Sequence, residues 1–352
     1  SLEPGSMSWK RRKPSGAFSM IMNMKERIYY PLLAVLMVLF CTACNEEWTD
    51  EQYERYVSFK APMNYAKGVT DIYVKYKSNG MVTYQLPLIM SGSTMAGSDT
   101  EVQVAIDSDT LKSINWEYFH NRKDLYYREL TSGYYELDDM KVMIPAGDCM
   151  GILDINFKLS GIDLVDKWVL PLTIAESPTG SYEPHPRKNY KKALLRVIPF
   201  NDYSGTYSTT TMQVGFKNAG NKMTTNERTA FVVDEHSIFF YAGLINEEEL
   251  ERRKYKIIFT LNADGTVTLF APDPDIHFKL IKNPTWKVTE KMDVSLPYLK
   301  HKTITIENFK YEFDDVTSVP GTPISYTVEG TVNMERKINI QIPDEDQQIQ
   351  WD

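Results

Sequence analysis

Paired carboxylates are the residues with which this chain could catalyse a reaction, because two Asp or Glu side chains can cleave a glycosidic bond as acid and base. Asp234 with Glu235, and Asp293 with Asp314, are the pairs that could take these roles. Their separation in space does not follow from their spacing in the sequence. A glycoside hydrolase with such a pair is therefore kept as an alternative function.

Other catalytic patterns are missing from the sequence. Asp163 and Asp166 precede Lys167 and Trp168, so no acid stands in place as a proton donor, and we interpret the segment as a turn before a strand. No Gly-x-Ser-x-Gly turn presents a serine nucleophile, and no Gly-x-x-x-x-Gly-Lys-Ser/Thr loop could cradle a phosphate. We therefore predict that the protein has no catalytic residues and is not an enzyme.

Metal ligands are sparse as well. Asp273 with Asp275, or Asp314 with Asp315, could offer oxygens to calcium, but neither pair supplies the larger set of oxygens that calcium takes. The histidines have no metal-ligand spacing; they are His120, His185, His236, His277 and His301. We predict no metal site and no cofactor.

Aromatic residues are abundant in the second half of the chain. Sugar rings can stack on flat aromatic faces, although most aromatic residues of a β protein belong to its core. Trp286 follows Pro284 and Tyr298 follows Pro297, which places both at expected loop edges. These two residues, together with Tyr241, are the predicted glycan-binding residues.

The N-terminal segment has the pattern of a lipoprotein signal peptide. Lys25 and Arg27 precede an apolar run at 32–40, and small residues stand directly before Cys44. We therefore predict that residues 1–43 are an upstream extension and a signal peptide, and that Cys44 carries a lipid anchor. A transmembrane helix is the alternative, but it needs ~20 apolar residues, more than this run provides.

Removal of residues 1–43 leaves a more acidic chain. These residues carry six Lys/Arg and two Asp/Glu, so the net charge changes from −8 to −12. This balance argues against nucleic acid as a partner and against binding of anionic lipid by charge. With Cys44 acylated, Cys149 has no partner for an intramolecular disulfide, so the fold must depend on its apolar core.

Residues 44–52 form a predicted acidic tether between the anchor and the folded part. Acidic residues directly after a lipidated cysteine resemble the surface-export signal of Bacteroidetes lipoproteins. The predicted location is therefore the outer membrane, lipid-anchored and facing the cell exterior.

Alternating apolar and polar residues predict an all-β protein of two domains. Residues 53–198 are expected to form an immunoglobulin-like β-sandwich. A polar stretch at 108–135 predicts a loop with a short helix. The strands are predicted at 57–60, 70–76, 82–90, 101–107, 141–144, 151–159, 168–174 and 192–198.

Residues 199–352 are expected to form a lipocalin-like β-barrel or a jelly roll. Asn262 to Gly265 predicts a tight hairpin, and Asn246 to Arg253 is the one strong helix candidate. The strands are predicted at 229–233, 237–242, 255–261, 266–271, 276–281, 285–289, 303–311, 325–332 and 337–342.

Short motifs in both domains resemble one family of proteins. In the first domain they are Tyr84-Gln-Leu-Pro-Leu, Tyr134-Tyr-Glu-Leu, Ile144-Pro-Ala-Gly and Val169-Leu-Pro-Leu-Thr-Ile. In the second they are Tyr203-Ser-Gly-Thr-Tyr, Phe240-Tyr-Ala-Gly, Arg253-Lys-Tyr, Met292-Asp, Pro297-Tyr and Gln341-Ile-Pro-Asp-Glu-Asp-Gln. The chain thereby resembles two-domain Bacteroidetes lipoproteins encoded in polysaccharide-utilisation loci. Its first domain is similar to one that precedes the catalytic barrel in some family 18 endoglycosidases, a barrel that this chain lacks.

The resemblance implies a non-catalytic lipoprotein that captures polysaccharide or oligosaccharide at the cell surface. Its expected partners are the glycan, the membrane through the lipid anchor, and an outer-membrane glycan importer with its lipoproteins; nucleic acid is not expected. A structural or accessory subunit, or an adhesin component that contacts protein partners, is an alternative beside the glycoside hydrolase.

Overall fold

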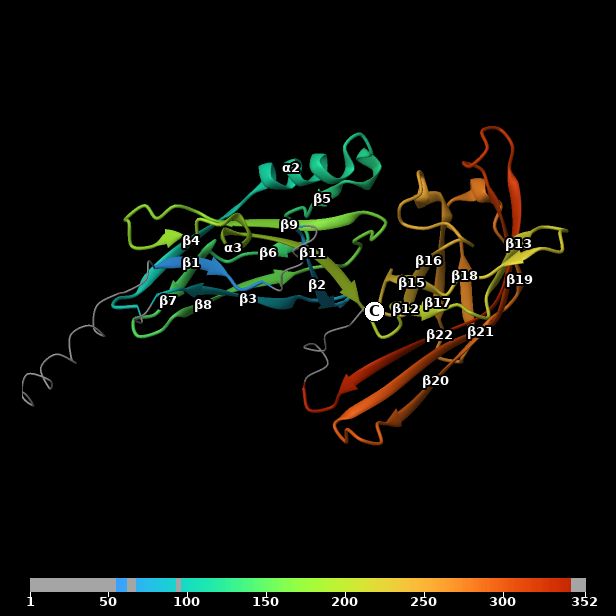
Figure 1. Ribbon diagram of the computed structural model, residues 1–352. Helices are drawn as coiled ribbons and strands as arrows, with labels where there is room; N and C mark the ends of the chain where they lie inside the picture. Colours follow the sequence, from blue (N-terminus) through green and yellow to red (C-terminus); the bar gives the residue numbers. More distant parts are fainter. Residues whose placement is uncertain (1–54, 62–67, 93–95, 343–352) are drawn as a thin grey trace, which may run out of the picture. The chain divides into compact units, whose positions relative to one another are not determined.

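The computed structural model describes residues 55–61, 68–92 and 96–342 (Figure 1). Within these residues the chain is all-β and has two domains built on curled sheets, as predicted. Both domains belong to one compact unit. The predicted signal peptide, Cys44 and the tether lie outside the described residues. None of the described helices is long and apolar enough to cross a bilayer.

The first domain is a sandwich of two sheets. In spatial order, one sheet consists of β10 (Glu183–Pro184), β1 (Tyr56–Phe59), β3 (Val82–Met90), β8 (Met150–Phe157) and β6 (Tyr135–Glu136). The other consists of β2 (Thr70–Lys75), β11 (Lys192–Phe200), β9 (Lys167–Ile174), β4 (Thr100–Ile106) and β7 (Lys141–Ile144), with β5 (Tyr127–Glu129) beside β9. Neighbours are antiparallel except β1–β10, β2–β11 and β5–β9. The predicted sandwich is confirmed.

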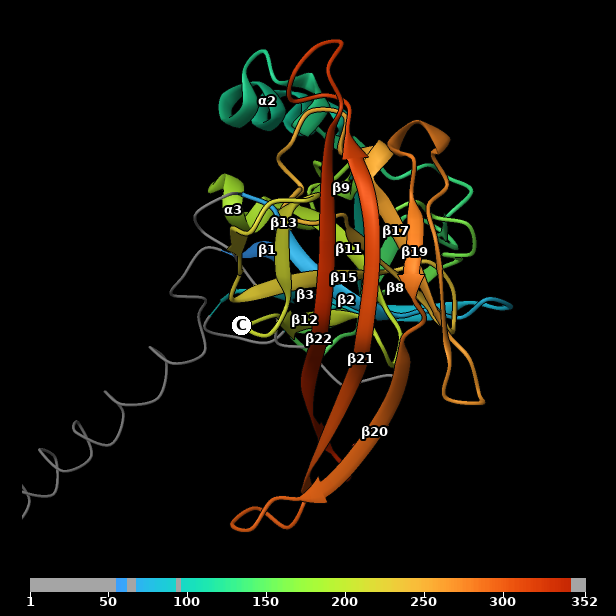
Figure 2. The same ribbon diagram turned by 90° about the vertical axis from the view of Figure 1, so that its right-hand side faces the viewer.

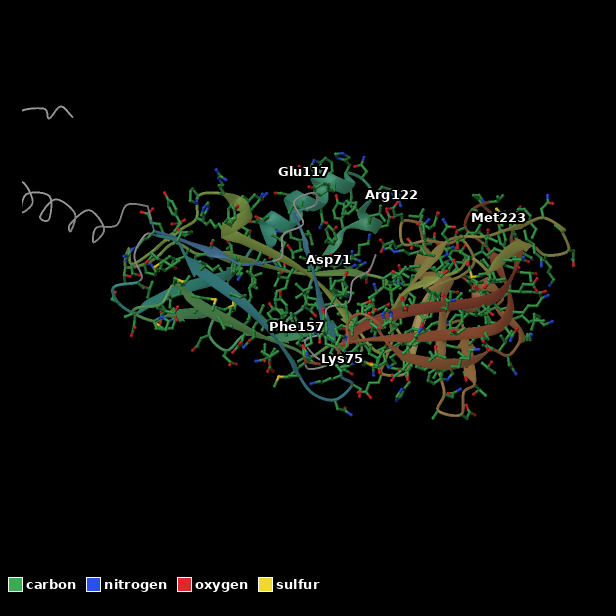
Figure 3. The ribbon with its side chains drawn as sticks, turned by 60° about the horizontal axis from the view of Figure 1, so that its bottom comes forward. Asp71, Lys75, Glu117, Arg122, Phe157 and Met223 are labelled. Carbon is green, nitrogen blue, oxygen red and sulfur yellow. The ribbon has the colours of Figure 1, made fainter. Side chains whose placement is uncertain are left out.

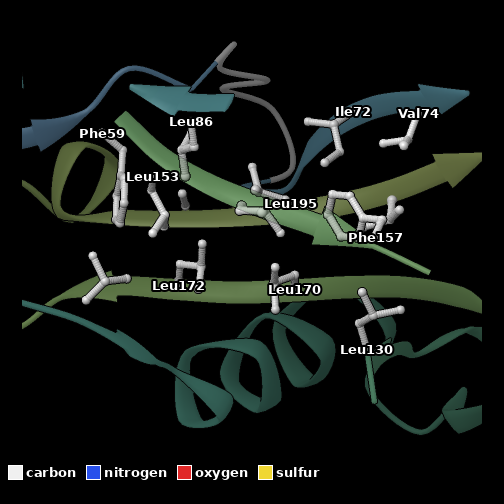
Figure 4. Packing of buried hydrophobic residues seen from close by; sticks show 14 of the residues in the cluster. Phe59, Ile72, Val74, Leu86, Leu130, Leu153, Phe157, Leu170, Leu172 and Leu195 are labelled. Atoms are coloured by element: carbon white, nitrogen blue, oxygen red, sulfur yellow. The ribbon is translucent and has the colours of Figure 1, made fainter. Parts of the chain in front are cut away.

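The core of the sandwich follows from the two-residue period of its strands. In β2 every second residue is buried, and β8 alternates in the same way. Leu86, Leu170 and Leu195 are fully buried between the sheets (Figure 4). Burial of each such side chain stabilises the fold by ~2 kcal/mol.

Helices occupy little of the first domain. They are α2 (Ser108–Phe119), the 3-10 turn η1 (Lys123–Leu125) and the short α3 (Lys188–Lys191). Asp107 caps α2, because its Oδ1 accepts a hydrogen bond from the amide of Thr110 at 3.1 Å. The stretch predicted as a loop with a short helix therefore contains a capped helix of 12 residues.

The second domain is one strongly curled antiparallel sheet. Its strands are β12 (Gly205–Ser208), β13 (Gln213–Phe216), β14 (Lys222–Met223), β15 (Glu227–Val232), β16 (Ser237–Tyr241), β17 (Lys256–Leu261), β18 (Val267–Phe270), β19 (Lys279–Lys282), β20 (Thr285–Met292), β21 (Leu299–Asp315) and β22 (Ile324–Asn339). The 3-10 turns are η2 (Arg252–Tyr255) and η3 (Pro274–Ile276). Strands β15 to β18, and then β20 to β22, pair with their sequence neighbours.

This meander distinguishes between the two predicted architectures. A jelly roll needs Greek-key crossings, whereas consecutive pairing is the connectivity of an up-and-down barrel. The sheet curls back on itself at two seams: Ser208 on β12 faces Asn333 on β22, and a bridge joins Thr266 to Thr285. The described strands therefore favour the barrel-like alternative. Its interior is filled by an apolar core rich in aromatic residues.

Three predictions of local structure in the second domain are wrong. Asn246 to Arg253 is a turn that ends in η2, because the Asn246 side chain accepts from the amide of Glu248. In a helix, Glu247 and Glu251 would also lie one turn apart and repel each other. Of the separate strand predicted at 337–342, residues 337–339 are the end of β22 and residues 340–342 form a turn. Residues 276–281 belong partly to η3 and partly to β19. The Asn262–Gly265 hairpin is confirmed, with Gly265 at φ +83°.

The longest strands extend beyond the curled body. Strands β21 and β22 have 17 and 16 residues, and their ends away from the β21–β22 turn form a three-stranded ribbon with β20 (Figure 2). We name residues 287–303 and 333–342 the distal ribbon. Gly330 lies on β22 at φ +154°, where a Cβ atom would stand 2.6 Å from the Cα of Met212, so only glycine fits.

Candidate functional site

A cleft lies where the two domains meet. It has a volume of about 330 Å³, within the usual range for small-ligand sites. The first domain contributes β2 and β11, and the second contributes β15, β16 and the loop after β16. The lining residues are Asp71, Tyr73, Arg196, Ile198, Glu227, Arg228, Thr229, Phe231, Phe240, Tyr241, Ile245, Asn246 and Glu247.

Strand alternation and register place the polar wall. Asp71 and Tyr73 occupy the positions of β2 that do not face the sandwich core. The parallel register sets Arg196 opposite Asp71 and Ile198 opposite Tyr73. Because cross-strand neighbours share a face, these four side chains point out of the same surface; Figure 3 labels Asp71 on β2.

Charged side chains at the cleft lie close together, and the contacts of Arg196 are longer than direct hydrogen bonds. The Nη1 of Arg196 lies 3.9 Å from the Oδ1 of Asp71, and its Nη2 lies 3.8 Å from the Oε2 of Glu247. The Nζ of Lys167 lies 3.5 Å from the other Glu247 oxygen. A direct N–H···O bond has a length of ~2.9 Å, so these charges are balanced while their polar atoms can still bond to hydroxyl groups.

Tyr73 adds a neutral hydrogen-bonding group. Burial, followed by the neighbouring carboxylate of Asp71, raises the pKa of Tyr73 to about 12, and Arg196 opposes this shift. The phenol is therefore protonated at neutral pH and can donate a hydrogen bond.

Arg228 holds the loop that forms one wall. Its Nη1 donates to the carbonyl of Ile245 at 2.8 Å, and its Nη2 donates to the carbonyl of Gly243. Burial lowers the pKa of Arg228, but a guanidinium stays charged in proteins. Its buried Nε has no hydrogen-bond partner. This residue positions the loop that presents Glu247.

The apolar wall consists of stacked rings. Phe231 on β15 lies parallel to Phe239 at a centroid distance of 5.1 Å and contacts Tyr241 edge-on at 6.1 Å. Such contacts keep rings in one orientation. The cleft therefore combines a rigid aromatic wall with a polar wall of balanced charge.

Ion pairs between the domains keep the two walls in place. Arg253 pairs with Asp163 and Asp166, and Lys256 lies 3.1 Å from Asp163. The guanidinium of Arg252 donates to the carbonyls of Asp124 and Val165. The Asp163–Asp166 segment thus holds the domains together, and the Arg253-Lys-Tyr motif is part of the same contact.

The three predicted glycan-binding residues lie in different places. Tyr241 lines the cleft, although only 7% of it is exposed. Trp286 is at the start of strand β20, and its indole is half-buried and donates to the carbonyl of Asn262 at 2.7 Å. Tyr298 is exposed, at the end of the distal ribbon. The structure does not bring the three residues together.

The carboxylate pairs weighed for hydrolysis do not form a site. Asp293 bonds His301 near one end of β21, whereas Asp314 is near the other end. At ~3.3 Å per residue these ends are roughly 40 Å apart, far beyond the ~5–10 Å that separates catalytic carboxylates. Glu235 bonds Ser78 and is exposed.

The acidic pairs considered for calcium have structural partners. Asp273 caps η3, and Asp275 lies 3.7 Å from Lys254. Asp315 accepts hydrogen bonds from the hydroxyl of Tyr255 and from backbone amides. In the described part of the chain, no cluster of three or more His, Cys, Asp and Glu side chains could hold a metal ion.

Sequence reasoning missed the polar wall of the cleft. One signal was present: Arg196 stands in the middle of the apolar strand Lys192–Phe200, and a charge in such a strand needs a partner. Asp71 and Glu247 carry no comparable mark, because their proximity to Arg196 depends on sheet order.

Family models match both domains. A domain of unknown function, DUF4973, matches residues 48–178, and a second model, of a C-terminal domain, matches residues 191–333. No protein with a curated description matches the chain.

Solved structures from Bacteroides are similar over nearly the whole chain. A Bacteroides ovatus protein of unknown function is 48% identical with a TM-score of 0.77, and the match covers 84% of this chain and all of that one. A multidomain protein including DUF1735, from the same species, is 47% identical with a TM-score of 0.76 over the same shares. An auxiliary nutrient binding protein from Bacteroides thetaiotaomicron is 38% identical with a TM-score of 0.74, covering 85% of this chain and all of that one.

Proposed function

Because the chain belongs to the family of two-domain proteins that join a DUF4973 domain to this C-terminal domain, we propose that it is a non-catalytic glycan-binding protein. The binding site is the cleft between the domains. The bound molecule is a polysaccharide or oligosaccharide that the protein captures for uptake by an outer-membrane importer.

The arrangement around Arg196 is the observation that carries this proposal. Sugars are neutral and rich in hydroxyl groups, so a binding site needs donors and acceptors whose charges are balanced within the protein. The 3.5–3.9 Å separations in the Arg196–Glu247–Lys167 network provide such groups, and the Phe231 side offers an apolar surface.

The comparisons support a binding role in general terms. One relative, 38% identical, is described as an auxiliary nutrient binding protein. The two family models that match the chain indicate no catalytic activity.

Affinity electrophoresis against a panel of host and plant polysaccharides tests the proposal. We expect one glycan class to retard residues 45–352, and Asp71→Asn with Glu247→Gln to weaken retardation by about tenfold, which corresponds to two hydrogen bonds of ~0.7 kcal/mol each. Trp116→Ala is the matched control, because Trp116 is 59% exposed on α2, outside the cleft. Absence of retardation by every glycan would refute the proposal.

A lipid anchor at Cys44 and an outer-membrane location facing the cell exterior complete the proposed function. Metabolic labelling with a radioactive fatty acid should mark the wild-type chain in its native host and should not mark Cys44→Ala. Protease digestion of intact cells tests the outward orientation, and cleavage only after lysis would contradict it.

A further inference from the structure

Apolar side chains gather at the end of the distal ribbon. Val294 is 91% exposed in the β20–β21 turn, and Leu296 and Tyr298 are exposed beside it. The backbone amide of Ile340 donates to the carbonyl of Tyr298 at 2.9 Å, so the end of β22 lies against the same turn. Met292, Ile340 and Ile342 add further exposed apolar surface. We name residues 292–298 and 340–342 the ribbon tip.

The turn at the ribbon tip is held in one shape. The Oδ1 of Asp293 accepts from the amides of Ser295 and Leu296 at 2.8 and 2.9 Å. Its Oδ2 lies 2.8 Å from the Nε2 of His301, whose Nδ1 lies 2.7 Å from the Oε1 of Glu335. This network crosses all three strands, so Val294 and Leu296 are presented on a preformed turn.

The distal ribbon carries more cations than anions. Residues 287–303 and 333–342 have six Lys/Arg against three Asp/Glu, although the whole chain has a net charge of −8. Lys291, His301 and Lys337 are aligned across β20, β21 and β22. Within the described part of the chain, no acidic side chain lies within ion-pair distance of Lys291 or Lys337, and both are exposed. Two lysines without an ion pair among the described residues therefore flank the ribbon tip, in a chain that is acidic as a whole.

We propose that the ribbon tip is a membrane contact: it inserts its aliphatic turn shallowly into a lipid surface whose anionic headgroups pair with Lys291 and Lys337. Aliphatic side chains enter the acyl boundary, a tyrosine suits the headgroup level, and lysines bind anionic lipid. This contact is separate from the predicted anchor at Cys44 and from the glycan cleft.

Charge and geometry favour a lipid surface over a second copy of the chain as the partner of the ribbon tip. A second copy of the chain would present the same lysines, and like charges repel. A lipid surface, in contrast, has anionic headgroups directly above an apolar acyl region. The lysines can pair with the headgroups while Val294, the most exposed large apolar residue of the turn, enters the acyl region.

Vesicle co-sedimentation tests the proposal with residues 45–352, which contain every described element but no acylated cysteine. The probes are vesicles of phosphatidylcholine alone and of phosphatidylcholine with phosphatidylglycerol. We expect partition onto the anionic vesicles, a loss of about fivefold for each of Lys291→Gln and Lys337→Gln, and a loss of at least about tenfold for Val294→Asp with Leu296→Asp. Leu250→Asp, at a loop residue that is 60% exposed outside the ribbon, is the matched control.

The remaining outcomes overturn the proposal. The wild type could fail to bind either kind of vesicle, or the variants could bind as strongly as the wild type. A third such outcome is that the wild type binds no vesicles but co-purifies with an importer subunit that the Val294 variant loses. A lowered melting temperature of that variant without vesicles would also overturn it, because the tip would then be covered by the chain itself. Retardation in polysaccharide gels should be unchanged in the tip variants, which separates this test from that of the cleft.

Discussion

The cleft and the ribbon tip expose their side chains in opposite ways. In the cleft, Arg196 lies between two carboxylates, and rings pack against rings. At the tip, Val294 is 91% exposed, and neither Lys291 nor Lys337 beside it has an acidic partner among the described residues. A site with balanced charge can bind a neutral polar ligand. Positive charge beside exposed aliphatic side chains can instead bind a membrane with anionic headgroups and an apolar interior.

This difference shows that the net charge of the whole chain does not predict the local charge of either region. Each region is formed by β-strands with exposed polar residues, and their local sequences look similar. The cleft has balanced charge because two domains face each other, whereas the tip is a single layer with no described residue opposite it.

The largest expected effect is on stability and comes from Arg228, which supports the cleft. Arg228→Met leaves the carbonyls of Gly243 and Ile245 without their donor, and we expect the free energy of unfolding to fall by about 2–4 kcal/mol. Urea denaturation measures this change. Lys291→Met at the tip should change it by less than ~0.5 kcal/mol. Equal effects of the two substitutions would remove the structural distinction between the regions.

Two tyrosines sharpen the comparison in binding. Tyr73→Ala removes a protonated hydroxyl group from the cleft and should weaken binding of the retarding glycan by about tenfold, or ~1.4 kcal/mol. Tyr298→Ala should leave glycan binding unchanged and weaken vesicle partition. Isothermal titration with a soluble oligosaccharide measures the effect of Tyr73→Ala. If Tyr298→Ala weakened glycan binding and Tyr73→Ala did not, the glycan site would lie on the ribbon instead of in the cleft.

Asp202 connects the first domain to the ribbon and gives a smaller effect. Its Oδ1 lies 2.6 Å from Lys75 and its Oδ2 lies 3.2 Å from Lys302. Although burial opposes the shift, the two lysines lower the pKa of Asp202 to about 2. The stabilisation is therefore present above pH ~4 and is lost as the pH falls through ~2.

Asp202→Asn should remove this pH dependence. Because 43% of the Asp202 side chain is exposed, solvent screening reduces the contribution to about 1 kcal/mol. Denaturation curves at pH 5 and pH 2.5 measure the difference, and an unchanged difference between the two pH values in the variant would contradict the assignment. Asp139→Asn, at an exposed turn residue before β7, is the control.

The smallest effect is expected at the tip itself. Hydrogen bonds to Asp293 and then to Glu335 raise the pKa of His301 above its usual value near 6.5. Any stabilisation is therefore complete below that value and is lost as the pH rises through the raised pKa. An NMR titration of the ring should show the shift, and Asp293→Asn should reduce it. A midpoint at the ordinary value in the wild type would show that the turn is not held by His301.

Much of the fold follows from the sequence, and most of the site does not. The strands of the sandwich and the hairpin at Gly265 obey local rules, so their prediction is confirmed. The helix predicted at Asn246 failed because the Asn246 side chain forms a turn and Arg252 and Arg253 bind the other domain. Trp286 lies at the start of β20, next to the loop that ends at Pro284, but the sequence did not indicate that its indole bonds to the Asn262 hairpin.

By itself, the sequence determined which strand faces are buried and where the chain must turn, because these properties depend on residues within a few positions of one another. Only the tertiary structure decided that Arg196 meets Asp71 and Glu247, since the three residues come from separate segments and depend on sheet order and domain contact. It also decided that the ends of β20, β21 and β22 form a single-layered ribbon. Apolar and polar residues alternate in those strands as they do in the barrel. The ends of the strands are exposed because no other described part of the chain packs against them.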